Sequence, residues 1–169
     1  IGGMRSAAQL TAYEIPLLIT VLSIAVISGS FNILEIIDFQ IETSDTWNIF
    51  ILPLGAVLFL VSMIAEVERI PFDMPEAEAE LVEGWWTEYG GMRFGLLFAA
   101  EYMRVYAASI LFAHFFMGGW HAPFAGTIGS IPYLGAAWLA IPGVIWTLLK
   151  AWFIFTVVFV WARTALPRI

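Results

Sequence analysis

The chain has 169 residues, of which 61% are hydrophobic and 12% charged, and its mean hydropathy is +0.88. Soluble domains contain about 45–50% apolar residues, so we expect most of this chain to lie in lipid. Its net charge of −7 argues against nucleic acid and anionic lipid surfaces as partners, and the lack of cysteine excludes disulfides, thiolate catalysis and cysteine-bound iron–sulfur clusters.

The first predicted element is a membrane span at about residues 10–30. It overlaps an uncharged run of 20 residues, 15–34, which is longer than the core of a signal peptide and indicates a retained helix. Glu14 and Pro16 fall near its start, and proline is tolerated in a first turn because the backbone N–H groups there have no helical partner. In the following connection, LEIIDFQI is typical of a short amphipathic helix at the interface.

Three further spans are predicted, at about residues 49–66, 92–118 and 133–163. The last of these apolar runs would be about 45 Å long if wholly helical, whereas the hydrocarbon core is about 30 Å thick. It must therefore tilt, project from the membrane or kink, and Pro142 is the expected kink or helix start.

The positive charges predict the orientation of these spans. Two of the seven Lys and Arg residues lie within spans, and the other five are Arg5, Arg69, Arg93, Arg163 and Arg168. With four spans, all five fall on one side, which the positive-inside rule assigns to the cytoplasm. We therefore expect an all-α, polytopic transmembrane helix bundle, a single membrane domain over residues 1–169 with both termini cytoplasmic.

Eight of the fourteen carboxylates fall in the predicted cytoplasmic loop at about residues 66–91. The prolines of RIPFDMP exclude a regular helix there, because each fixes its own φ and disfavours a helical residue before it. The following EAEAELVEG is rich in helix formers and predicts a short helix that ends near Gly84. This stretch is either a solvated acidic helix or a functional cluster of carboxylates.

Ionisable residues also fall within the predicted spans, where each costs about 2.5–3.5 kcal/mol at a helix centre unless it is paired or hydrated. Glu14 and Glu66 lie near the cytoplasmic ends of their spans, where an acid can also simply reach the interface. Glu101 lies about 12 Å deeper than Arg93 along a helix, and Arg104 is close enough to pair with it. An ion pair that serves only helix packing is the alternative to a functional role.

Lys150 is placed about 20 Å from the inner boundary by the rise of a helix that ends at Arg163, so we expect a carboxylate or water as its partner. Ordered by depth, the ionisable residues run inward from Glu66, Glu88 and Glu101 to Arg104 and Lys150. Chains of titratable groups in lipid are typical of proton paths, and this order predicts one. His114 is expected at the outer interface, and the histidine spacing predicts no metal site.

The stretch AEVERIPFDMPEAEAELVEGWWTEYGG resembles one family, the quinone-proximal membrane subunits of respiratory complex I, NADH:quinone oxidoreductase. The resemblance continues upstream through GGMRSAAQLTAYEIP and downstream through AEY, GGW and ALPR, so it spans nearly the whole chain. Departures are mild and include Met74 for leucine and Gly90-Gly91 for Ser-Gly. By this pattern we expect the family's first helices and its last helix to be missing from the chain.

The resemblance implies that the chain forms part of a quinone chamber and of a glutamate-rich path that couples quinone reduction to proton pumping. It implies Arg69 and Phe72 as walls of the chamber. With the residues ordered by depth, the expected path comprises Glu14, Glu66, Asp73, Glu76, Glu78, Glu80, Glu88, Glu101, Arg104 and Lys150. The chain itself is expected to hold no catalytic residue, metal or cofactor.

The resemblance also implies quinone as the substrate, with FMN and iron–sulfur clusters in partner subunits. The expected partners are iron–sulfur and quinone-binding subunits of the peripheral arm, small membrane subunits, antiporter-like subunits and lipid. The equivalent component of a membrane-bound hydrogenase or formate hydrogenlyase is the alternative, followed by a secondary transporter and a structural scaffold. We expect a prokaryotic plasma membrane, with thylakoid and mitochondrial inner membranes as alternatives.

Overall fold

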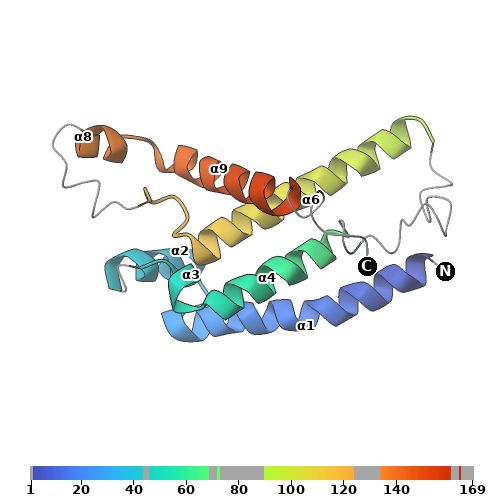
Figure 1. Cartoon of the computed structure of the whole chain (residues 1–169), viewed down its shortest axis with the longest axis horizontal. Coiled ribbons are helices and arrows are strands. Elements are labelled where there is room, and N and C mark those ends of the chain that lie inside the picture. The colour runs from blue at the N-terminus through green and yellow to red at the C-terminus, as the bar shows by residue number, and fades with distance from the viewer. Residues whose placement is uncertain are drawn as a thin grey trace.

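The computed structural model describes residues 2–43, 46–68, 72, 90–123, 134–160 and 164, and the secondary structure within these ranges is entirely helical (Figure 1). Most of the acidic loop therefore lies outside the described residues, including the predicted helix that ends near Gly84. The same holds for three of the arginines that predicted the orientation, which are Arg69, Arg163 and Arg168.

The first helix, α1 (Gly2–Ser28), begins well before the predicted span. The helix-forming stretch that contains Ala7, Ala8 and Gln9 extends it toward the N-terminus. Pro16 consequently lies inside the helix, and the expectation that it falls in the first turn was wrong. The helix ends at Gly29, whose φ of +73° is the left-handed conformation that terminates many helices.

The connection after α1 contains the predicted short helix, α2 (Ile33–Asp38), which continues as a π-helical stretch, η1 (Phe39–Thr43). Asn32 caps α2, because its side-chain oxygen accepts a hydrogen bond from the Leu34 N–H at 3.1 Å. Ile36 and Ile37 are buried while Leu34 is exposed, so this helix is amphipathic as predicted.

The second predicted span is divided into α3 (Asn48–Ile51) and α4 (Pro53–Glu66). Pro53 causes the break, because it disfavours a helical conformation at Leu52, which adopts φ −125° and ψ 64°. Pro53 itself occupies the first turn of α4, where its missing N–H costs nothing.

The third predicted span matches α6 (Met92–Phe116) closely. The fourth contains α8 (Leu134–Leu139), α9 (Gly143–Ile154) and a π-helical continuation, η3 (Phe155–Val160). The prediction that a helix starts at Pro142 is confirmed, because Pro142 directly precedes α9 with ψ 137°.

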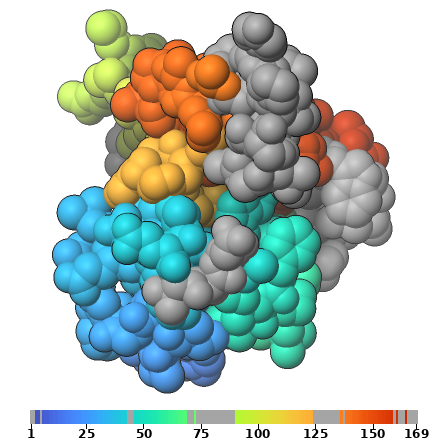
Figure 2. Space-filling model, turned by 90° about the vertical axis from the view of Figure 1, so that its left-hand side faces the viewer, coloured from blue at the N-terminus to red at the C-terminus, as the bar shows by residue number. Residues whose placement is uncertain are grey.

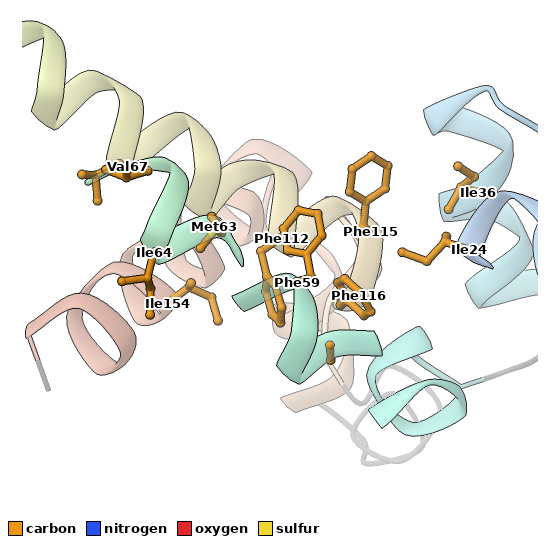
Figure 3. Packing of buried hydrophobic residues seen from close by; sticks show 12 residues of the cluster. Ile24, Ile36, Phe59, Met63, Ile64, Val67, Phe112, Phe115, Phe116 and Ile154 are labelled. Carbon is orange, nitrogen blue, oxygen red and sulfur yellow. The ribbon is translucent and has the colours of Figure 1, made fainter. Parts of the chain in front are cut away.

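Two helix pairs build the fold: α1 packs along α4, and α9 packs across α6 (Figure 1). An aromatic cluster joins the two pairs, in which the ring of Phe59 on α4 lies 5.9 Å from that of Phe112 and 5.5 Å from that of Phe116 on α6 (Figure 3). Both α6 rings are fully buried, and each such burial contributes about 1.5–3 kcal/mol. The core thus surrounds the C-terminal half of α6, while most side chains in the N-terminal half are exposed.

Among the described residues, two helices are long and apolar enough to cross a membrane, Ser6–Ser28 within α1 and Met92–Phe116. Two further apolar segments, Pro53–Glu66 and Gly143–Val158, are shorter. The outer faces of these helices carry large exposed apolar side chains; on α1, Ile19 is 57% exposed and Val26 79%. Apolar surface of this extent is typical of helices that face lipid or a partner protein. The described residues therefore fit a helical membrane protein.

Candidate functional site

The beginning of the acidic loop is attached to one face of α1. The Ser6 hydroxyl donates a hydrogen bond to the carboxylate of Glu68, which has a left-handed backbone with φ 55°. The Gln9 amide donates to two backbone carbonyls, and the ring of Tyr13 packs on Phe72 with 5.2 Å between centroids. The three α1 residues lie at spacings of three and four, so they share one side of the helix.

Three helices bring predicted path residues together beside this attachment. Glu66 ends α4 and is half-buried, Glu14 on α1 is exposed, and Arg104 on α6 is exposed. The charges that act on the Glu66 carboxyl are those of Arg104, Glu14 and Glu68. Two carboxylates from separate helices and an arginine from a third therefore share one electrostatic environment.

Glu101 lies on α6, one turn before Arg104, and is half-buried. It stands nine residues into the helix, or about 14 Å from the start. Phe72, the predicted chamber wall, is half-buried at the loop attachment. The other predicted site residues lie outside the described ranges: Arg69, Asp73, Glu76, Glu78, Glu80 and Glu88.

Lys150 on α9 is buried, and the partners that the structure gives it are backbone carbonyls, whereas a carboxylate or water was expected. Its ammonium group donates to the carbonyls of Met117 at 2.6 Å, Gly119 at 2.9 Å and His121 at 2.7 Å. These carbonyls become available because α6 ends at Phe116 and the chain turns, leaving acceptors without helical donors. All three ammonium protons are thereby matched, and the negative end of the α6 dipole favours a cation there.

The position of Lys150 also differs from the depth order predicted. Its partner Met117 lies thirteen residues beyond Arg104, which is about 20 Å along α6. Lys150 is thus at the opposite end of α6 from the acidic loop and does not continue inward from Arg104. The prediction counted residues back from Arg163, whereas the structure places Lys150 by its bonds to the end of α6, which α9 crosses.

A second polar cluster, absent from the sequence-based prediction, lies at the same end of α6. The Gln40 side-chain oxygen accepts from the backbone N–H groups of Asn48 at 3.2 Å and Gly118 at 3.1 Å, and its amide donates to the His114 carbonyl at 3.1 Å. The Asn48 amide donates to the Phe115 carbonyl at 2.9 Å. These bonds tie the 33–48 segment to the end of α6, and Figure 2 shows that segment between the ends of α1 and α6.

The two histidines at this end, His114 and His121, lie among the residues that surround the end of α6. The His114 ring lies 2.7 Å from the Ile110 carbonyl through Nδ1, and it meets the Trp120 ring edge-on. Burial, and next the charge of Lys150, lower the pKa of His121, although Asp38 and Glu42 act in the opposite direction. His121 is therefore neutral at pH 7, which suits a residue whose carbonyl already binds an ammonium group. No cluster of metal-binding side chains occurs among the residues that the structure describes.

Gly119, at this end of the molecule, has little room for a side chain. A Cβ added there would lie 2.8 Å from Cδ1 of Ile37 and 3.2 Å from the ring of His114, and the φ of +52° also disfavours a side chain. We expect Gly119→Ala to lower the free energy of unfolding by about 1–3 kcal/mol through overpacking. Thermal unfolding of the purified full-length protein in detergent measures the effect.

Gly29→Ala is the matched control for Gly119→Ala. Gly29 has a similarly positive φ of +73°, but nothing lies within 4 Å of its added Cβ. It should therefore show only the backbone cost, about 1 kcal/mol. Equal losses from the two variants would mean that Ile37 and His114 do not confine Gly119.

Comparison with known proteins places these features in context. The sequence matches the NADH dehydrogenase family over residues 1–169. The H subunits of NADH-quinone oxidoreductase from Anoxybacillus flavithermus and Geobacillus kaustophilus are each 40% identical over 169 residues, which is 100% of this chain and 46% of each relative. The protein of the same name from Bacillus thuringiensis is 41% identical over 171 residues, with the same coverage. The chain thus spans about half the length of the curated relatives it matches.

Proposed function

This chain belongs to the NADH dehydrogenase family, and we propose that it forms part of the quinone-proximal membrane subunit of a proton-translocating NADH:quinone oxidoreductase. The observation that carries the proposal is the match of the whole chain to relatives that are named as H subunits of NADH-quinone oxidoreductase. These names favour the quinone enzyme over the hydrogenase-type alternative. The chain is not catalytic alone, since electrons reach quinone from flavin and iron–sulfur clusters in partner subunits.

In the proposed topology the chain crosses a prokaryotic plasma membrane four times, with both termini cytoplasmic, as one membrane domain. The two long apolar helices supply two crossings, and the proline-interrupted pairs α3–α4 and α8–α9 supply the others. The hydrogen bond from Ser6 to Glu68 supports a common side for the start of α1 and the acidic loop. Arg93 begins α6 on that side, in keeping with the positive-inside rule.

The acidic loop would couple quinone chemistry to proton movement through charge. Quinone takes up two electrons and two protons beside Arg69 and Phe72, and groups of the chamber that supply these protons become more negative. Neighbouring carboxylates in a low-dielectric site cannot all ionise, so some hold protons and can pass them on. The responding groups in the loop would be Asp73, Glu76, Glu78, Glu80 and Glu88.

From the loop, the shift in protonation would pass to the acids that the helices hold. The shared environment of Glu14, Glu66 and Arg104 supports this step, because a proton gained by one carboxylate changes the energy of the other. Glu101, one turn before Arg104 on α6, would carry the shift toward antiporter-like partner subunits. We leave Lys150 out of this path, because its ammonium group donates hydrogen bonds to three carbonyls at the other end of α6.

Co-purification tests the proposed function. The full-length protein that contains this chain, tagged in its own host and extracted in mild detergent, should bring with it flavin- and iron–sulfur-containing subunits and NADH:quinone reductase activity. An unrelated tagged membrane protein of the same host is the control. Recovery with hydrogenase subunits, or without any redox partner, would contradict the proposal.

A further inference from the structure

We propose that Gln9 is a positioning residue of the quinone chamber, whose side-chain amide fixes the backbone that displays Phe72. The inference rests on the proposed function, because Phe72 lines a chamber only if the complete protein reduces quinone. Gln9 touches no substrate in this role and acts through the loop it holds.

The two protons of the Gln9 amide nitrogen each have an acceptor. Nε2 lies 2.8 Å from the carbonyl oxygen of Ala65, the penultimate residue of α4, and 2.9 Å from that of Phe72. These carbonyls are seven residues apart, so one amide group joins the end of α4 to Phe72. The orientation of the amide is fixed, since the reverse would set its oxygen against two carbonyl oxygens.

Few side chains could replace Gln9 in this arrangement. It is 9% exposed, and lysine in its place would bring a charge that burial penalises. An ionised glutamate would have acceptors only, and methionine has a similar length without any donor. Glutamine is the uncharged side chain of this length that offers two N–H protons from one atom.

The two donors of the Gln9 amide hold the loop, whereas its Oε1 is buried and accepts no hydrogen bond from the described part of the chain.

The ring of Phe72 is held from the same face of α1. Tyr13, one turn beyond Gln9, packs against it with 5.2 Å between centroids and 60° between ring planes. The amide of Gln9 therefore fixes the backbone of Phe72 while Tyr13 fixes its ring. When the amide is lost, the backbone can move away from α1 and the ring loses its place in the chamber wall.

The test compares Gln9→Met with Gln40→Met in the assembled enzyme, using a short-chain ubiquinone analogue as substrate. We expect Gln9→Met to raise the KM for quinone about tenfold, equivalent to about 1.4 kcal/mol, with a smaller change in kcat. Gln40 is also buried and also bridges two segments, but at the other end of α6. Gln40→Met should lower the yield of enzyme and leave KM unchanged.

A double substitution tests whether Gln9 acts through Phe72. Phe72→Leu alone should raise KM, and Gln9→Met added to it should raise KM little further, because the two residues act as one unit. If the Gln9→Met enzyme does not assemble, Gln9→Asn is measured in its place. The shorter amide of asparagine can reach one carbonyl at most, so a raised KM again supports the proposal.

The outcomes separate this inference from the proposed function. If Phe72→Leu raises KM while Gln9→Met, or Gln9→Asn in its place, leaves KM as in the parent enzyme, Gln9 has no positioning role and the proposed function stands. Independent, multiplicative effects of Gln9→Met and Phe72→Leu on KM would also overturn the inference. If the parent enzyme does not reduce quinone at all, the proposed function fails and the inference fails with it.

Discussion

Glu101→Gln should reduce proton pumping and quinone reduction together, by roughly 100-fold, in the assembled enzyme. Glutamine has nearly the shape of glutamic acid but cannot gain or release a proton, and positioned proton-transfer groups contribute about 10²–10⁴ in rate. Because Glu101 is half-buried on α6 and does not stabilise the fold through the aromatic cluster, the enzyme should still assemble. Quinone reductase rates and acidification of proteoliposomes, measured on the same preparation, give the two quantities.

Two further variants sharpen this experiment. Glu101→Asp keeps a carboxyl group and should retain part of the activity, which separates loss of the proton carrier from loss of shape. Glu35→Gln removes an exposed acid from α2, outside the proposed path, and should leave both rates unchanged. If Glu101→Gln pumped and reduced quinone at the parent rates, Glu101 would have no place in the path.

The sequence predicted best those elements whose ends are marked by local chemistry. The apolar run beginning at Met92 and the proline at 142 gave helix positions that the structure confirms. The break at Pro53 was missed because it lies within an uncharged run of 20 residues, 46–65, and hydropathy alone does not divide such a run. Pro16 was misplaced because the span was predicted to begin at about residue 10, whereas the helix begins at Gly2.

The site was predictable only where a charge stands out in apolar sequence. Glu14, Glu66 and Arg104 were identified in that way, and the structure brings them into one electrostatic environment. Gln9 and Gln40 carry no charge, so their roles appear only when folding supplies backbone partners from distant segments. A polar amide at the edge of a long apolar run was the signal available, and it was too weak to assign a role.

Lys150 illustrates a more general limit, because its partners are backbone carbonyls. A sequence shows which side chains are present but not which carbonyls a helix end leaves without donors. Counting residues along the predicted helix therefore suggested a lysine near the membrane centre whose partner is a carboxylate or water. The structure instead uses the lysine to join α9 to the end of α6.

Lys150→Met should accordingly impair stability rather than proton transfer. Methionine keeps an unbranched side chain but leaves three carbonyls without a donor, and the buried one, that of Gly119, alone costs about 1–3 kcal/mol. The temperature of thermal inactivation of the full-length protein should fall as a result. The contact of the ammonium group with the Trp47 ring, 5.1 Å away, would be lost as well.

Thr147→Val is the matched control for Lys150→Met. Thr147 lies one turn earlier on α9, and within the described residues its hydroxyl bonds only to the local Gly143 carbonyl. It should shift the inactivation temperature little. In the fraction of Lys150→Met enzyme that remains folded, the number of protons pumped per quinone reduced should equal the parent value. The reason is that the ammonium group, bound to carbonyls, lies about 20 Å along α6 from Arg104. A fully stable Lys150→Met enzyme with reduced pumping would instead place Lys150 in the proton path, as the order of charges along the sequence had predicted.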